Sequence, residues 1–400
     1  MARIFIAWEL GGGLGHLSNV VTLSRQLCGQ GHEVIFALNE LSQLEKFSLP
    51  EGMTVVPAPA SRRSPGRDFK TVCVSSILLN RGYSGVGTLS AMLRCWQGLY
   101  SLVKADLFIF DYAPTAMLAA RPLTTPKVLL GADFYNLSPG HPNRQLAPWI
   151  PDAEQILRHH EARVVGVINA VSDYFGFSKL KYLGDLFATD LALLSTLPEI
   201  DDYPRDSQAV KYLSVGNPQA GLLKPHWCNN GKPKVLAYLK AANKQTKFVL
   251  EALLSAEADV MCFCAGLNQS DAETYQQAGL KLFTSPIAVS ELLSEAQVIV
   301  CHAGKGMISE SLRQGIPLML LPGQLEQHRN ATAVAEKKLG LMVPKHATTE
   351  QIGAILKTLS DNTIFRNNAI SVAENHGYES AASMLSRGVD AIETLLSEPL

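Results

Sequence analysis

The sequence lacks an excess of charge of either sign. Thirty-five lysines and arginines nearly balance 36 aspartates and glutamates, which leaves a formal net charge of −1 over 400 residues. A chain without bulk charge has no general electrostatic attraction to nucleic acid or to an anionic membrane. We therefore predict no nucleic-acid partner, whereas a weak peripheral membrane contact through a local patch stays open.

Long apolar runs and paired cysteines are also missing. No stretch reaches the roughly 18 continuous apolar residues that a spanning helix needs. The N-terminal apolar run, Arg3 to Trp8, is short and meets a glycine cluster, so it indicates a first β-strand and not a secretory signal. The seven cysteines have no spacing typical of a disulfide framework or a zinc site, and we interpret them as reduced core residues. These absences predict a soluble, cytoplasmic protein.

What the chain does have is a globular composition and a repeated alternation of strands and helices. Hydrophobic residues make up 47% and charged residues 18%, and the length exceeds what one hydrophobic core usually serves. Strand–helix alternation in both halves predicts an α/β protein with parallel sheets. The segment 214–231 contains prolines and glycines and is interpreted as an interdomain linker. The predicted strands are 3–8, 32–38, 107–110, 127–130, 232–239, 259–265, 281–284, 298–301 and 317–322, and the longer predicted helices are 17–28, 69–80, 87–104, 153–183, 245–255 and 380–396.

A glycine-containing turn in the second half carries the strongest functional signal. His302, Gly304, Lys305 and Gly306 lie between the apolar run VIVC and a predicted helix. Unpaired amides at a helix start, small residues that let a ligand approach and a local cation together make an anion site, for which phosphate is the natural candidate. The alternatives are a plain helix cap with incidental glycines and, for Lys305, a solvated side chain.

Further polar residues lie at what should be the same edge of the sheet. Glu310 follows Gly306 by four residues and so shares its helix face, one turn deeper, where a carboxylate can accept hydrogen bonds from sugar hydroxyls. Glu326, Gln327 and Asn330 follow the next buried strand. The carboxyl edge of the sheet is where open α/β folds bind ligands.

The glycine turn of the first half, GGGLGH, places a histidine where a dinucleotide fold would have glycine. Gly11 and Gly13 begin the pattern GxGxxG, but His16 does not complete it. The imidazole lies at a helix start, whose positive end favours the neutral ring. Asp111 ends the buried run LFIF and should lie at the same sheet edge. A capping or buried role for His16, and a helix N-cap role for Asp111, stay open.

The runs HAGKGMISESL, GIPLMLLP and EQHRNA resemble the donor-binding signature of nucleotide-sugar glycosyltransferases of the GT-B fold. The similarity is to the natural-product group, whose pattern is roughly HGGxGTxxEAL followed by GxPxxxxPxxxDQxxNA. It implies two Rossmann-like domains facing across a cleft. Two residues depart from the pattern: Met307 replaces a hydroxyl residue near the phosphates, and Glu326 replaces the commoner aspartate.

Site roles follow from this resemblance residue by residue. His302 and the turn amides would hold the diphosphate, and Glu310 the ribose. Ile287 and Val289 would flank the nucleobase, although a plain strand-to-helix connection is an equal alternative. Further implied donor contacts are Gly15 and the pair Glu326 and Gln327, which would bind the donor sugar. The pair GLGH and FDYAP matches the family's general base and its orienting aspartate at His16 and Asp111. Tyr135 lies in a long aromatic loop that the resemblance places along the acceptor cleft; it either lines that cleft or packs, and we favour packing.

The implied activity is inverting, metal-independent transfer of a hexose from a UDP- or TDP-sugar to a hydroxyl of a small-molecule or lipid acceptor. No cofactor is expected, because the nucleotide sugar is a co-substrate, and no acidic metal triplet is seen. The expected domains are 1–217 for the acceptor, 218–378 for the donor, and 379–400 as a helix packing back on the first domain. A nucleotide-sugar hydrolase or epimerase and a non-catalytic nucleotide-sugar-binding protein stay open, with an oxidoreductase as the weakest rival. The sugar, the nucleotide, the acceptor and the oligomeric state are not determined by the sequence.

Overall fold

The computed structural model describes residues 1–12, 14–42, 44–59, 68–201, 203–206, 208–213, 222–228 and 230–397. The chain divides into two compact units. The first consists of Met1–Leu197, Asp201–Val215 and Ala382–Leu400, and the second of Pro198–Ile200 and Gly216–Ala381. The expected boundary between residues 217 and 218 lies outside the described residues.

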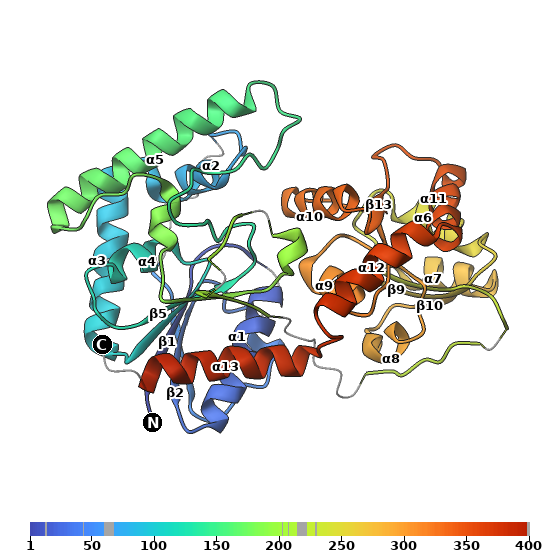
Figure 1. The fold of residues 1–400 in the computed structure, drawn as a ribbon, viewed down its shortest axis with the longest axis horizontal. Helices are drawn as coiled ribbons and strands as arrows, with labels where there is room; N and C mark the ends of the chain where they lie inside the picture. The colour runs from blue at the N-terminus through green and yellow to red at the C-terminus, as the bar shows by residue number, and fades with distance from the viewer. Residues whose placement is uncertain are drawn as a thin grey trace. The chain divides into compact units, whose positions relative to one another are not determined.

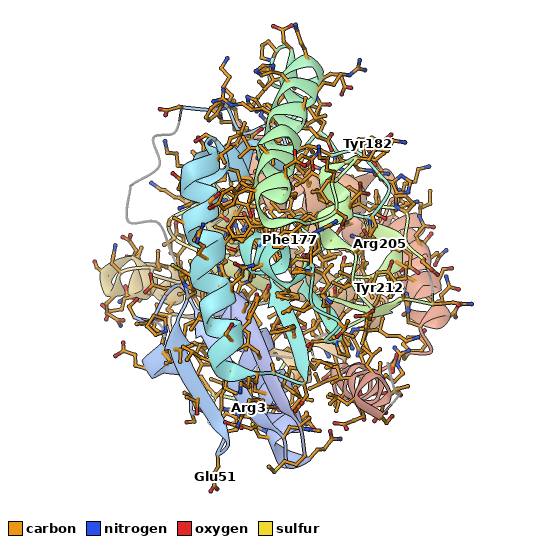
Figure 2. The ribbon with its side chains drawn as sticks, turned by 90° about the vertical axis from the view of Figure 1, so that its left-hand side faces the viewer. Arg3, Glu51, Phe177, Tyr182, Arg205 and Tyr212 are labelled. Atoms are coloured by element: carbon orange, nitrogen blue, oxygen red, sulfur yellow. The ribbon has the colours of Figure 1, made fainter. Side chains whose placement is uncertain are left out.

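The first unit is built on a seven-stranded parallel sheet with the order β3-β2-β1-β4-β5-β6-β7. Its central strands are apolar on both faces, as expected where helices cover both sides of a parallel sheet. Arg3 and Glu51, close to the amino ends of β1 and β3, lie at the same edge of this unit (Figure 2). The strands are β1 (Arg3–Trp8), β2 (Glu33–Leu38), β3 (Met53–Pro57), β4 (Leu107–Asp111), β5 (Lys127–Gly131), β6 (Leu191–Leu194) and β7 (Val210–Tyr212).

Helices pack on both faces of this sheet. On one face, α1 (Leu14–Gly29) and the C-terminal helix α13 (Ala381–Ser397) share a core with alternate residues of the strands. Figure 1 shows α13 beside β1 and β2. On the other face, aromatic residues of α3 (Val86–Val103) contact Phe5 of β1. The remaining helices of this unit include α2 (Val74–Leu78), α4 (Pro114–Ala120) and α5 (Ala153–Phe175).

The second unit repeats the plan with a six-stranded parallel sheet of order β10-β9-β8-β11-β12-β13. Its core is formed by the strands together with α6 and α11. The strands are β8 (Lys234–Lys240), β9 (Asp259–Ala265), β10 (Lys281–Phe283), β11 (Val298–Cys301), β12 (Leu318–Leu320) and β13 (Gly340–Met342). The helices are α6 (Thr246–Leu254), α7 (Gln269–Gln277), α8 (Val289–Leu293), α9 (Lys305–Arg313), α10 (Leu325–Glu336), α11 (Thr349–Asp361) and α12 (Thr363–Asn375).

The prediction of an α/β chain with two parallel-sheet domains is confirmed, but two helix predictions are wrong in extent. The helix predicted over 153–183 ends at Phe175, because Gly176 adopts a left-handed conformation with φ of 73° and stops it. The helix predicted over 69–80 is reduced to α2 followed by a π-helical turn at Leu79–Tyr83. Among the described residues, no helix has both the length and the apolar character required to cross a membrane.

Candidate active site

Two neighbouring strands of the first sheet end at its topological switch point. β1 pairs with β2 on one side and with β4 on the other, and Trp8 is in register with Asp111. Connections from the two strands therefore leave the sheet in opposite directions, which opens a crevice at their carboxyl ends. His16 lies in the first turn of α1, directly after β1. The topology thus brings His16 and Asp111 to one place.

His16 and Asp111 form a hydrogen-bonded pair. Nδ1 of His16 lies 2.9 Å from each carboxylate oxygen of Asp111. The Asp111 side chain is completely buried, whereas 14% of the His16 side chain is exposed. A buried carboxylate can only accept, so Nδ1 carries the proton and Nε2 of the neutral ring has the lone pair. The predicted residues meet, and their catalytic roles stay predictions.

An aromatic ring packs against the imidazole of His16, and a glycine leaves room for it. Trp8 stacks on it with ring centroids 5.2 Å apart and an interplanar angle of 21°. Gly11 has φ of +85°, and a Cβ at that position would lie 2.6 Å from Nε2 of His16. The backbone can therefore pass close to Nε2 only because this residue has no side chain. Gly15, a predicted donor contact, is exposed next to His16 and has open space around its Cα.

Tyr135 contacts the His16–Asp111 pair, which the sequence did not indicate. Its hydroxyl donates to Oδ1 of Asp111 at 2.9 Å, and its ring lies 5.7 Å from that of His16. The interpretation of this side chain as packing was therefore incomplete. Its sequence signal was weak, since it is one aromatic residue in a long loop.

Glu9 is a buried acidic residue close to His16 in the chain that the sequence analysis did not single out. It follows β1 directly, is 5% exposed, and its Oε2 accepts from the backbone amide of Thr115 at 2.7 Å at the start of α4. Burial raises the pKa of this carboxyl to about 7, although the hydrogen bonds from Thr115 and Ala116 act in the opposite direction. An acidic residue immediately after a buried strand was the available signal.

In the second unit, His302 follows β11 at the corresponding switch point, next to the end of β8. Its Nε2 accepts from the amide of Lys240 at 2.8 Å, and Nδ1 lies 3.0 Å from the carbonyl of Leu321. Burial, with a smaller contribution from Lys240, lowers the pKa of the ring. His302 therefore ties three strand ends together as a neutral imidazole. Its predicted contact with a diphosphate would replace one of these bonds.

The turn after His302 has the open character that the sequence indicated. Ala303 adopts φ of 58°, and a Cβ at Gly304 or Gly306 would meet nothing within 4 Å. Gly304 is the N-cap of α9, so the amides of its first turn follow directly. Lys305 is only 7% exposed and its Nζ donates to the carbonyl of Ile200 at 3.3 Å. It is therefore not a solvated side chain.

Glu310, one turn into α9, is half-buried. Burial raises the pKa of this carboxyl, while Arg313 on the same helix opposes the shift. Burial raises the pKa of the Tyr238 phenol on β8, and the nearby Glu310 carboxylate acts in the same direction. No hydrogen bond to the Glu310 carboxylate is formed by the residues that the structure describes.

Three polar residues of α10, the helix that follows β12, were predicted to lie at the donor site, and they differ in their contacts. Glu326 is half-buried in the first turn of the helix. Gln327 turns back, and its Oε1 accepts from the amide of Gly323 at 2.8 Å. Asn330 is buried, and its Nδ2 donates to the carbonyl of Ala303 at 2.9 Å, which supports the left-handed turn before α9.

The predicted nucleobase contacts are buried. Ile287 is 2% and Val289 5% exposed, and the amide of the intervening Ala288 donates to the carbonyl of Leu223. The contact of these two side chains with a nucleobase stays a prediction. No group of three or more His, Cys, Asp or Glu residues suited to a metal lies in the described part of the chain.

This chain is similar to known glycosyltransferases in sequence and in fold. Residues 240–384 match the family described as glycosyltransferase family 28 C-terminal domain. The zeaxanthin glucosyltransferase of Pseudescherichia vulneris is 20% identical over 95% of this chain and 97% of its own length. Two solved structures, the spinosyn rhamnosyltransferase SpnG and the glycosyltransferase VinC in complex with DTDP, each align with a TM-score of 0.66 and 16% identity. They cover 98% of this chain and 100% and 99% of their own chains, respectively. The resemblance inferred from the motifs is confirmed: residues 240–384 match a glycosyltransferase domain family, and the chain has the fold of the solved glycosyltransferases.

Proposed function

We propose that the protein transfers a sugar from a nucleotide diphosphate sugar to an acceptor hydroxyl with inversion of configuration. The observation that carries the proposal is the hydrogen-bonded pair of His16 and the fully buried Asp111 at the switch point of the first sheet. Such a pair fixes the tautomer of the imidazole and stabilises the imidazolium that forms when the ring takes a proton.

The proposed step is a single displacement. The acceptor hydroxyl gives its proton to Nε2 of His16 while its oxygen forms a bond to the anomeric carbon of the sugar. The bond from that carbon to the diphosphate oxygen breaks, and the nucleotide diphosphate leaves with the electron pair. Because the acceptor attacks opposite the leaving group, the configuration inverts. Asp111 stabilises the imidazolium through Nδ1.

The donor is proposed to bind in the second unit. The amides at the start of α9 would meet the diphosphate, and the half-buried carboxylate of Glu310 would accept from the ribose hydroxyls. Glu326 and Gln327 would contact the sugar. For this contact, Oε1 of Gln327 would give up its hydrogen bond from the amide of Gly323. Since VinC was solved with DTDP, thymidine diphosphate is the first candidate for the leaving group, and uridine diphosphate is the second, from the resemblance in sequence. No metal and no cofactor are part of this proposal.

The first test is thermal stabilisation of the purified protein by a panel of nucleotide diphosphates and nucleotide sugars, with magnesium and with chelator. Stabilisation by one diphosphate that persists in chelator is the expected result. No shift with any of them at millimolar concentration would remove the basis for a donor site.

The second test follows the donor that stabilises the protein. His16→Ala should lower transfer to an acceptor alcohol by about two to four orders of magnitude, as expected for the loss of a general base. Exposed His159, in α5, provides the control His159→Ala, which should leave transfer unchanged. Turnover of His16→Ala within a few-fold of wild type would contradict the general-base role. Consumption of donor at equal rates with and without acceptor would indicate a hydrolase instead.

A further inference from the structure

The phenol of Tyr135 and the imidazole of His16, the proposed general base, are hydrogen-bonded to the same carboxylate. Tyr135 donates to Oδ1 of Asp111 at 2.9 Å, and Nδ1 of His16 lies 2.9 Å from the same oxygen. The Asp111 side chain has no contact with solvent. In such a site the carboxylate depends on its protein donors for both its orientation and its charge.

The backbone positions the phenol at this place. The amide of Ala132 donates to the Tyr135 hydroxyl at 3.1 Å, so the hydroxyl oxygen accepts one hydrogen bond and gives its proton to Asp111. Gly131, at the end of β5, has φ of +110°. A Cβ at this residue would lie 2.3 Å from the Tyr135 hydroxyl and 2.7 Å from Oδ1 of Asp111. Only glycine permits the phenol and the carboxylate to meet here.

Stacking restricts the Tyr135 ring as well. It lies 4.1 Å from the ring of Tyr112 with an interplanar angle of 15°. Tyr112 itself has φ of 46°, an uncommon conformation for a bulky residue, and its ring also stacks on His16 at 6.5 Å. The hydroxyl of Tyr135 therefore has little freedom to turn away from Asp111.

We propose that Tyr135 is a positioning residue that fixes the orientation of the Asp111 carboxylate and weakens its attraction for a proton on His16. His16 is thereby held in one tautomer and stays unprotonated on Nε2, where it can accept a proton. This inference rests on the proposed role of His16 as general base. It adds a third member to the pair, acting through Asp111 and not on the substrate.

The hydrogen bond from Tyr135 also affects the pKa of His16 through the charge on Asp111. A hydrogen bond from Tyr135 draws electron density from the carboxylate and so weakens its attraction for an imidazolium. In Tyr135→Phe, the carboxylate keeps His16 as its side-chain donor, and the imidazolium is stabilised more strongly. The titratable groups at the His16 ring include Asp111, Tyr112 and Tyr135, while Glu9 on the neighbouring backbone is bound to Thr115. Removal of the Tyr135 hydroxyl should therefore raise the pKa of His16.

The experiment is a proton NMR titration of protein with labelled histidines, in wild type, Tyr135→Phe and a matched control. The His16 signal is assigned by its absence in His16→Ala. The control is Tyr100→Phe, which removes another buried tyrosyl hydrogen bond, from the hydroxyl to the carbonyl of Ala116 at 2.7 Å. We expect the pKa of His16 to rise by about half a unit or more in Tyr135→Phe and to be unchanged in Tyr100→Phe.

A parallel pH profile of kcat should move its acidic limb upward by the same amount in Tyr135→Phe, with the KM for the donor within twofold. An unchanged His16 titration in Tyr135→Phe, or an equal shift in Tyr100→Phe, would overturn the positioning role. If wild type transfers no sugar yet the titration shifts as expected, the proposed function fails and the coupling of Tyr135 to His16 stands. Because the NMR readout needs no turnover, the two failures are distinguishable.

Discussion

The buried carboxyl of Glu9 makes the stability of the first unit depend on pH. Burial raises its pKa from 4.5 to about 7. The folded state therefore prefers the protonated acid, and the contribution of this group to stability falls as the pH rises from 4.5 towards 7. A shift of about 2.5 units corresponds to about 3 kcal/mol. Below pH 4.5 the carboxyl is protonated in both states and contributes no pH dependence.

Glu9→Gln removes this titration while it keeps an oxygen that can accept from the amide of Thr115. Oε1 of Glu9 has no hydrogen-bond partner among the described residues. The protonated acid of the wild type and the amide of Glu9→Gln both place a donor group at this position. The energetic cost of burying that donor is therefore similar in the two proteins and does not contribute to the pH dependence of their difference. The stability of Glu9→Gln relative to wild type should therefore increase by about 3 kcal/mol between pH 4.5 and pH 8. For a unit of this size, that corresponds to roughly 6–12 °C in Tm.

The assay is calorimetry of both proteins across this pH range. Glu45→Gln, at an exposed position in the same unit, controls for the loss of one negative charge. A difference between wild type and Glu9→Gln that is constant with pH would refute the argument. An increase in the stability of wild type relative to Glu9→Gln as the pH rises would refute it as well.

Three further changes test other contacts. Gly11→Ala should lower kcat by about a hundredfold without unfolding the protein, because the methyl group displaces the His16 ring, as measured by steady-state kinetics and circular dichroism. Arg205→Met should destabilise the first unit to urea by about 3–5 kcal/mol, since it leaves the buried Asp201 carboxylate without its ion-pair partner. Asn330→Ala, which frees the turn before α9, should raise the donor KM by about fivefold with less change in kcat.

The ion pair of Arg205 and Asp201 also shows what the sequence did not disclose. The guanidinium donates to Asp201 at 3.0 Å, and the hydroxyl of Tyr212 donates to the same carboxylate at 3.1 Å. Figure 2 shows Arg205 and Tyr212 on the same side of the first unit. Tyr212 lies on β7, a three-residue strand at the sheet edge that the sequence pattern did not indicate. Val210–Tyr212 is too short and too exposed to show the periodicity of a strand in the sequence.

The central strands, by contrast, could be predicted closely. Strands such as β1 and β4 are buried on both faces and appear as continuous apolar runs, so their ends were located within a residue or two. Parallel pairing then places the residues that follow them at one edge, which is why His16 and Asp111 could be paired from the sequence. Tyr135 could not, because its loop follows a path set by contacts of Gly131 and Ala132 that exist only in the folded chain.

The two histidines at the switch points have the same place in the topology and different chemistry. At His16, a carboxylate accepts from Nδ1, an arrangement that favours proton uptake at the other nitrogen. At His302, a backbone amide donates to Nε2 and burial lowers the pKa, so proton uptake is opposed. A ring that stays neutral cannot offset the charge of a diphosphate. We therefore expect the charge of a bound diphosphate to be met by the amides at the start of α9, with His302 holding that turn in place.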